Sequence, residues 1–110
     1  MNRLAYKNRS EVGFIDFDKI IFIEKLQNKT IIHTKNNEIE IHSSLNSVYD
    51  KLDKEIFIRT HRSYIVNINH IKKIIPWGQK TYRIIFKGID EDALFSYERY
   101  KDFKDKVCQF

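Results

Sequence analysis

Cysteine, proline and glycine are scarce in this chain, and long apolar runs are absent. The single cysteine, Cys108, excludes an internal disulfide and fits a reducing cytoplasm. The longest apolar runs, such as residues 20–23, fall far short of the roughly 20 residues that a membrane-spanning helix needs. Residues 1–6 lack the apolar segment of a signal peptide. These features predict a cytoplasmic protein without a membrane segment.

Acidic residues are also fewer than basic ones: the chain has 15 aspartates and glutamates against 20 lysines and arginines. The net charge of +5 and the pI near 9.3 favour an anionic partner, most commonly nucleic acid. A bias of the coding DNA towards AT would also enrich lysine, isoleucine and asparagine, without selection for binding. The composition, with 42% hydrophobic and 32% charged residues, is that of an ordinary soluble protein. We expect residues 1–110 to form a single domain.

Short β-rich runs separated by polar turns dominate the chain. Because glycine and proline are so few, we place the turns at asparagine, aspartate, lysine and serine. The predicted turns are residues 8–10, 27–29, 35–37 and 77–80. The predicted strands are residues 4–7, 12–15, 20–26, 30–34, 38–42, 57–60, 63–66, 71–75, 81–86 and 94–96.

Apolar residues recur at helical spacing in two places. The first pattern is formed by Leu45, Val48, Tyr49 and Leu52. Ser43 or Ser44 precedes it as a candidate N-cap. Residues 100–107 form a weaker amphipathic pattern near the end of the chain. The sequence therefore predicts a mostly β domain with one mid-chain helix and a short C-terminal helix.

The chain offers little for catalysis or for metal binding. Its histidines lie too far apart in the sequence to form a compact ligand pair: they are His33, His42, His61 and His70. The sequence contains no glycine-rich phosphate loop and no nucleophile elbow. The carboxylates of Glu24, Glu38 and Glu40 alternate along strands, as on a solvated sheet face. We expect no enzymatic activity, no cofactor and no metal site.

The most informative stretch is residues 57–67, which read Phe-Ile-Arg-Thr-His-Arg-Ser-Tyr-Ile-Val-Asn. Apolar residues at both ends indicate buried strands, and Arg59, His61 and Arg62 lie between them. A core does not easily hold so many hydrogen-bond donors, so some must reach the surface or a polar partner. Arginine can bond guanine O6 and N7 or clamp phosphate. The pattern favours a loop that displays basic side chains between two packed strands.

Residues 57–67, with Ile71 and Ile74 following, resemble the signature of the LytTR family of DNA-binding domains from bacterial response regulators. The resemblance extends over about residues 14–104. It implies an elongated stack of small antiparallel sheets that binds double-stranded DNA sequence-specifically and regulates transcription. It also implies paired direct-repeat sites on the DNA and a receiver domain in a full-length two-component regulator.

The same resemblance places Arg62 in a loop that enters the major groove. Two interpretations of His61 are open: it contacts DNA, or it is a core histidine that bonds a neighbouring backbone carbonyl and fixes the loop. By strand alternation Arg59 and His61 point one way and Thr60 the other. Arg59 is therefore interpreted as a phosphate contact or as a structural ion-pair partner.

Two further segments of the family pattern carry candidate contacts. Residues 27–29 correspond to a second DNA-entering loop, so Asn28 or Lys29 would touch DNA, although a plain polar hairpin turn explains them too. The start of the last helix offers Ser96 and Arg99 to phosphate. This chain has Glu98 where the family commonly has arginine. Glu98 either accepts from cytosine N4 or helps to cap the helix while Arg99 takes over the contact.

Two other function classes remain open at the level of the sequence. One is a β-rich protein-interaction module whose basic surface meets an acidic partner. The other is a nonspecific RNA-binding domain, in which tyrosines such as Tyr64 and Tyr82 would stack on bases. Most of these tyrosines are explained as simply by a core rich in aromatic side chains.

Overall fold

Strands and turns alternate along the chain nearly as the sequence predicts. The computed structural model describes residues 2–107, so Cys108 lies outside the described residues. The strands are β1 (Arg3–Asn8), β2 (Glu11–Asp16), β3 (Phe22–Leu26), β4 (Lys29–His33), β5 (Glu38–Ile41), β6 (Phe57–His61), β7 (Tyr64–Asn67), β8 (Ile71–Pro76), β9 (Thr81–Phe86) and β10 (Asp92–Ser96). The α-helices are α1 (Leu45–Asp50) and α2 (Tyr97–Val107), and short 3-10 turns span Phe17–Lys19 and Ile68–His70.

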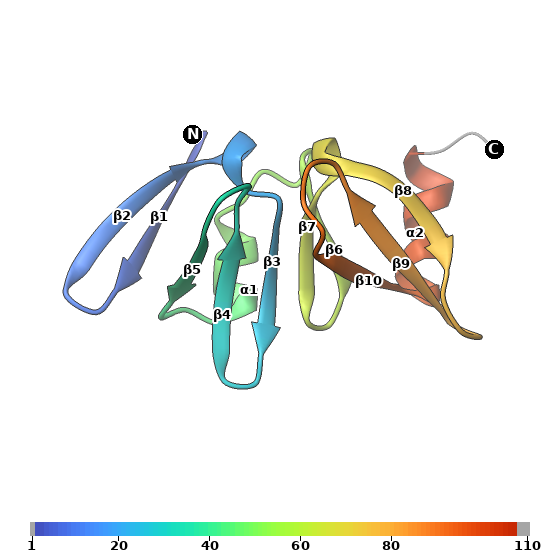
Figure 1. Cartoon of the computed structure of the whole chain (residues 1–110), viewed down its shortest axis with the longest axis horizontal. Helices are drawn as coiled ribbons and strands as arrows, with labels where there is room; N and C mark the ends of the chain where they lie inside the picture. The colour runs from blue at the N-terminus through green and yellow to red at the C-terminus, as the bar shows by residue number, and fades with distance from the viewer. Residues whose placement is uncertain (1, 108–110) are drawn as a thin grey trace.

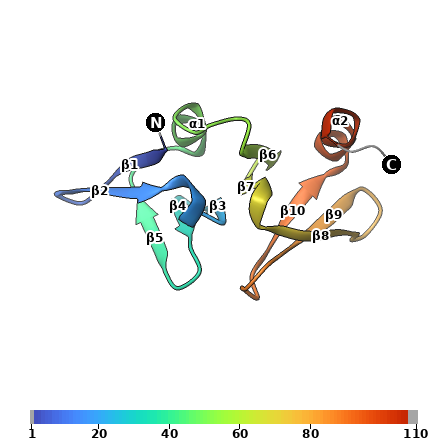
Figure 2. The same ribbon diagram turned by 90° about the horizontal axis from the view of Figure 1, so that it is seen from above.

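These strands form three antiparallel sheets in a row (Figure 1). The first is the β1–β2 hairpin, the second has the order β5-β4-β3-β7-β6, and the third has the order β10-β9-β8. The molecule measures 45 × 29 × 25 Å along its principal axes. Figure 2 shows that both helices lie on one side of this row. The predicted elongated stack of small sheets, with a mid-chain and a C-terminal helix, is confirmed.

The five-stranded sheet is the central layer, and its strands β3 and β7 place buried residues on both faces. Neighbouring residues of one strand enter different core clusters: Ile23 and Ile65 join the first cluster, whereas Phe22 and Val66 join the second. This follows from the period of two along a strand. The first cluster lies between this sheet, the hairpin and α1, and the second lies against the three-stranded sheet. Double burial explains why the central strands read as continuous apolar runs.

Glu24 corrects one expectation from the sequence. Its carboxylate does not lie on a solvated face, because Glu24 shares its face of β3 with Phe22, a member of the second core cluster. Glu24 Oε2 lies 2.5 Å from His33 Nε2 on the neighbouring strand, and the two side chains are only 16% and 6% exposed. The His33 ring stacks on Phe22 with a centroid distance of 4.1 Å. The carboxylate is therefore part of a buried polar pair rather than of the surface.

Most element boundaries differ from the expected ones by one or two residues, and two of these differences concern β3 and β4. Ile20 and Ile21 precede β3 instead of belonging to it, although both are fully buried. Lys29 is the first residue of β4, so the turn between β3 and β4 consists of Gln27 and Asn28. Ser44 is the N-cap of α1, as predicted: its Oγ accepts a hydrogen bond from the Ser47 backbone N–H at 3.1 Å.

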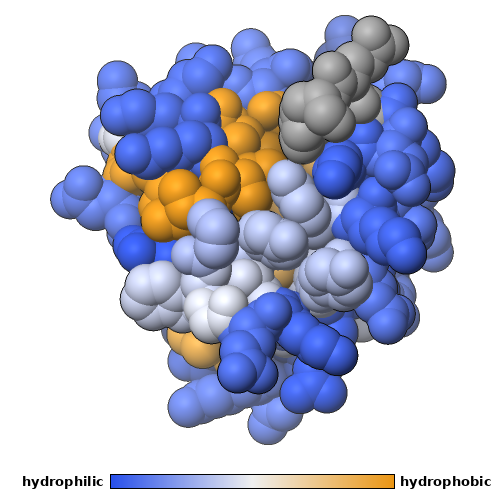
Figure 3. All heavy atoms as spheres, turned by 90° about the vertical axis from the view of Figure 1, so that its right-hand side faces the viewer, coloured by the Kyte–Doolittle hydropathy of each residue, from blue (hydrophilic) through white to orange (hydrophobic). Residues whose placement is uncertain are grey.

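Some apolar side chains at the two ends of the molecule are less buried than those in its middle. In β9, Ile84 is fully buried in the second cluster, whereas its neighbour Ile85 is half-buried on the outer face of the three-stranded sheet. Figure 3 views this end and shows an apolar patch bordered by hydrophilic side chains. At the other end, Val12 and Phe14 on the β1–β2 hairpin are 63% and 55% exposed. Neither helix of the described chain is long and apolar enough to cross a membrane.

Candidate nucleic-acid interface

Two hairpin tips from distant parts of the sequence lie side by side along one edge of the molecule (Figure 1). The strand order β4-β3-β7-β6 makes β3 and β7 direct antiparallel neighbours, so the β3–β4 and β6–β7 turns point in the same direction. The backbone N–H of Lys25 donates to the backbone carbonyl of Ser63 at 2.9 Å and links the two hairpins near their tips. The segments around Asn28 and Arg62 thus form one surface.

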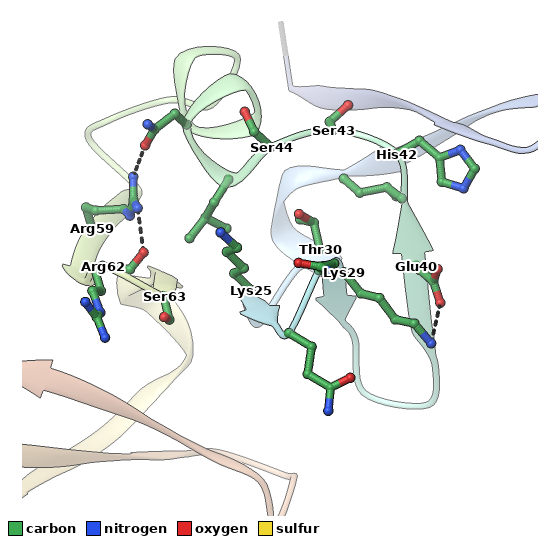
Figure 4. Close-up of a pocket in the computed structure, with 15 residues that line it drawn as sticks. Lys25, Lys29, Thr30, Glu40, His42, Ser43, Ser44, Arg59, Arg62 and Ser63 are labelled. Atoms are coloured by element: carbon green, nitrogen blue, oxygen red, sulfur yellow. Dashed lines mark hydrogen bonds and ion pairs between the residues drawn. The ribbon is translucent and has the colours of Figure 1, made fainter.

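Between the two tips the surface is hollowed to a volume of about 1040 Å³ (Figure 4). Residues of the β5–α1 connection and of the start of α1 also line it. Its charged lining is predominantly basic, because one carboxylate, that of Glu40, faces four lysine and arginine side chains. These cations are Lys25, Lys29, Arg59 and Arg62. A concave surface lined by one sign of charge concentrates the field on an anionic ligand such as a DNA backbone.

The β3–β4 turn presents its side chains with little internal support. Gln27 adopts a φ of 58°, in the left-handed region that costs a non-glycine residue about 1–2 kcal/mol. Asn28 is exposed, and its side-chain amide has no hydrogen-bond partner among residues 2–107. Lys29 lies 3.7 Å from Glu40 Oε1 with both side chains about half exposed, and such surface ion pairs contribute only about 0–1 kcal/mol. Lys29 can therefore exchange this carboxylate for a phosphate at small cost.

His61 fixes the β6–β7 loop from within. Its Nδ1 accepts a hydrogen bond from the Ser63 backbone N–H at 3.1 Å, and its ring meets Tyr64 edge-on at 5.6 Å. The expected bonding partner was a carbonyl, so the structure corrects the direction of the bond but supports the loop-fixing role. Burial, and then the positive charges of Arg62, Arg99 and Arg59, lower the pKa of His61. This favours the neutral ring that an accepting Nδ1 requires.

Arg59 does not form the ion pair that the sequence suggested as one possibility. Within the described chain its guanidinium bonds neutral oxygens: Nη1 donates to Asn46 Oδ1 at 2.6 Å, Nη2 to the Arg62 carbonyl at 2.7 Å, and Nε to the His61 carbonyl at 3.3 Å. A β-bulge between Arg59 and His61 breaks the regular alternation. Thr60 nevertheless points the other way, into the core, and is fully buried.

Arg62 is exposed at the tip, and its guanidinium has no partner among the residues that the structure describes. Its backbone is held, through the Arg59 bond to its carbonyl, while its side chain projects into solvent. A cation in this position contributes little to folding and is free to meet a ligand.

The start of α2 lies near the same surface. Ser96 Oγ accepts a hydrogen bond from the Arg99 backbone N–H at 3.4 Å and so caps the helix. Arg99 is exposed, and its charge acts on both His61 and Arg59. Arg99 and Arg59 also line a second, smaller groove together. Glu98 is exposed in the first helical turn, where the helix dipole favours a carboxylate.

The structure thus brings Asn28, Lys29 and Arg62 into one hollow and places Arg99 beside it, whereas the Ser96 hydroxyl is already engaged as a cap. Sequence reasoning missed Lys25 and Asn46. No local pattern could have revealed Asn46, because it lies 13 positions from the arginine that it contacts, on another element.

A β scaffold that gathers cations from two hairpin tips and a helix start is the arrangement of a nucleic-acid-binding domain. Residues 10–107 match the LytTr DNA-binding domain, and the chain belongs to this family. The described fold is also that of the LytTr DNA-binding domain from a Bacillus cereus protein described as a methyl-accepting/DNA response regulator. The TM-score is 0.81 at 28% identity, covering 96% of this chain and 95% of that one.

Two relatives illustrate the sequence similarity. The chain is 28% identical over 103 residues to the transcriptional regulatory protein NatR of Bacillus subtilis, covering 94% of this chain and 44% of NatR. It is 39% identical over 79 residues to the transcriptional regulatory protein LytR of Staphylococcus aureus, covering 71% of this chain and 31% of LytR. The chain therefore spans less than half the length of these relatives.

Proposed function

We propose that this domain recognises a specific double-stranded DNA sequence with the two hairpin tips and thereby directs transcription regulation. Arg62 reads a guanine in the major groove, and Asn28 reads a base edge from the neighbouring hairpin. Lys29, Arg99 and the capped start of α2 at Ser96 hold the phosphate backbone. His61 acts by fixing the loop rather than by touching a base. The observation that carries this proposal is the unpartnered Arg62 guanidinium beside a basic hollow.

The proposal extends to the setting of the domain. Residues 1–110 form one cytoplasmic DNA-binding unit that acts by binding, without a cofactor or catalysis. In a full-length regulator a receiver domain would control it, and on DNA it would occupy paired direct repeats. The free domain is expected to be a monomer at micromolar concentration. The apolar patch in Figure 3 is the surface to examine if sedimentation shows a tight dimer instead.

Selection of binding sites from random duplexes, followed by titration of matched and scrambled duplexes at two salt concentrations, tests the proposal. We expect a preferred sequence that the domain binds at least about 10³-fold more tightly than a scrambled one. Equal affinity for both duplexes with a steep salt dependence would indicate nonspecific nucleic-acid binding. Absence of binding would favour a protein-interaction module.

A further inference from the structure

Arg59 connects the loop that presents Arg62 to the body of the domain. Its guanidinium spans the gap between α1 and the β6–β7 loop, as Figure 4 shows. It bonds Asn46 on one side and the carbonyls of His61 and Arg62 on the other. The guanidinium is a rigid planar fork, so three bonds to it fix the relative positions of the groups that accept them. The carbonyl of Arg62 lies on the residue whose side chain is to read DNA.

The helix side of this connection is held by the core. Asn46 lies in α1, whose start is capped by Ser44. Leu45 and Val48, on the inner face of the helix, are 4% and 2% exposed within the first core cluster. Buried packing therefore holds the helix backbone that carries Asn46, whose own side chain is exposed. A continuous series of contacts runs from the core through α1 and Asn46 to the guanidinium of Arg59 and on to the loop backbone.

The loop side needs such support. The register of β6 against β7 is irregular between Arg59 and His61. A bulge disrupts the regular ladder and turns the strand, so ladder bonds alone do not define the direction of the tip. The side chain of Arg62 adds no anchor, since it is exposed and unpartnered within the described chain.

Arg59 lines the hollow, but three of the five N–H donors of its guanidinium are engaged within the protein. Each of its three nitrogens donates to an oxygen of the protein, and the residue is half-buried. Burial and then the nearby charge of Arg99 lower the pKa of Arg59. A residue that gave these bonds to a phosphate would release the loop carbonyls. Its geometry is that of a support for the loop rather than of a contact to DNA.

We propose that Arg59, held by Asn46, is a positioning residue that sets the direction in which Arg62 leaves the loop and so controls base discrimination. This inference rests on the proposed reading role of Arg62. The inference distinguishes the effect of loop direction from the effect of positive charge. A change in loop direction alters affinity for the preferred sequence, whereas a change in charge alters affinity for all sequences.

Arg59→Lys and Asn46→Ala test the proposal in the whole chain, with Arg3→Lys on the distant β1–β2 hairpin as the matched control. Lysine keeps the positive charge but lacks the planar guanidinium that bonds several oxygens at once. We expect Arg59→Lys to lower affinity for the selected duplex about five- to tenfold while leaving scrambled-duplex affinity and salt slope unchanged. Asn46→Ala should lower it about threefold, and the double variant should be no worse than Arg59→Lys, because both act through one connection. Arg3→Lys should change nothing.

Four results would overturn the inference. Equal losses on all duplexes after Arg59→Ala, with a shallower salt slope, would make Arg59 a phosphate contact. A lower melting temperature with unchanged discrimination, in both Arg59→Lys and Asn46→Ala, would make the bonds purely structural. If Arg62→Ala flattens the base preference but Arg59→Lys retains it, the positioning role of Arg59 is refuted, whereas the proposed function stands. If the wild-type domain shows no preference, the proposed function fails and the inference fails with it.

Discussion

The two hairpin tips of the interface are built differently. In the β6–β7 loop, Arg59 bonds the backbone from one side and the ring of His61 bonds Ser63 from the other. In the β3–β4 turn, Asn28 has no side-chain hydrogen bond within the described chain, and Lys29 has a solvent-exposed ion pair. One tip is preorganised and the other is adjustable. Preorganised groups avoid the entropy cost of ordering on binding, so the β6–β7 loop should dominate discrimination.

Removing the Arg62 guanidinium from the β6–β7 loop should have the largest effect on specific DNA affinity. A bidentate arginine–guanine contact gives about 1–3 kcal/mol of discrimination, so Arg62→Ala should lower specific affinity about tenfold or more. The preference at one guanine should flatten. The melting temperature should change little, because the side chain is exposed. Titration of duplexes that differ at single positions measures the effect.

The matched control for this change is Lys29→Ala at the adjustable tip. A lysine on phosphate carries no sequence information, so binding to every duplex should weaken about equally, and the salt slope should fall by about one unit. If Arg62→Ala instead unfolds the domain and leaves base preference intact in the residual binding, Arg62 is structural and the site assignment is wrong.

Asn28→Ala should have a smaller effect than Arg62→Ala. The β3–β4 turn lacks the side-chain hydrogen bonds that hold the backbone of the β6–β7 loop. Ordering this turn on binding offsets part of the gain, so we expect a loss of about threefold on the selected duplex alone. The same panel of duplexes and the same thermal melts apply. A loss as large as that from Arg62→Ala would show that internal support does not distinguish the two tips.

Glu98→Arg examines the helix start beside the supported tip. If Glu98 only stabilises the first turn of α2, the new arginine should strengthen binding to all sequences and steepen the salt slope by about one unit. If Glu98 accepts from cytosine N4, preference at one base pair should shift instead. Unchanged affinity, slope and preference would place Glu98 outside the interface.

The smallest expected effect concerns pH. The pKa of His61 is lowered from its ordinary value of 6.5 in the folded state, so the unfolded chain takes up the proton first as pH falls. The stability of the domain should therefore decline as the pH drops below about 6.5 and level off below the lowered pKa. His61→Asn, whose Oδ1 can replace the accepting Nδ1, should remove this component. Urea denaturation at about pH 7.5 and about pH 5.5 compares the two proteins. Equal pH dependence would contradict the neutral, loop-fixing histidine.

Much of the fold could be predicted from the sequence because it is encoded locally. The period of two marked the strands, the period of 3.6 marked α1, and Ser44 was one of two serines named as its cap. Residues 57–67 carried the family signature on one continuous segment, and the family match over residues 10–107 confirmed it. Arg62 was expected at an exposed tip, and it lies there because the polar pattern within that segment interrupts two buried strands.

The tertiary structure decided which distant segments meet. Only the pairing of β3 with β7 places Asn28 and Arg62 on one edge, since no local period specifies the order of strands in a sheet. Packing of the second core cluster on one face of β3 likewise covered Glu24, on a strand whose alternation had suggested a solvated face. The contact between Arg59 and Asn46 likewise depends on how α1 packs against the sheet. Local sequence determined the elements and the chemistry that they carry, whereas burial of shared apolar faces determined which of those chemical groups face one ligand.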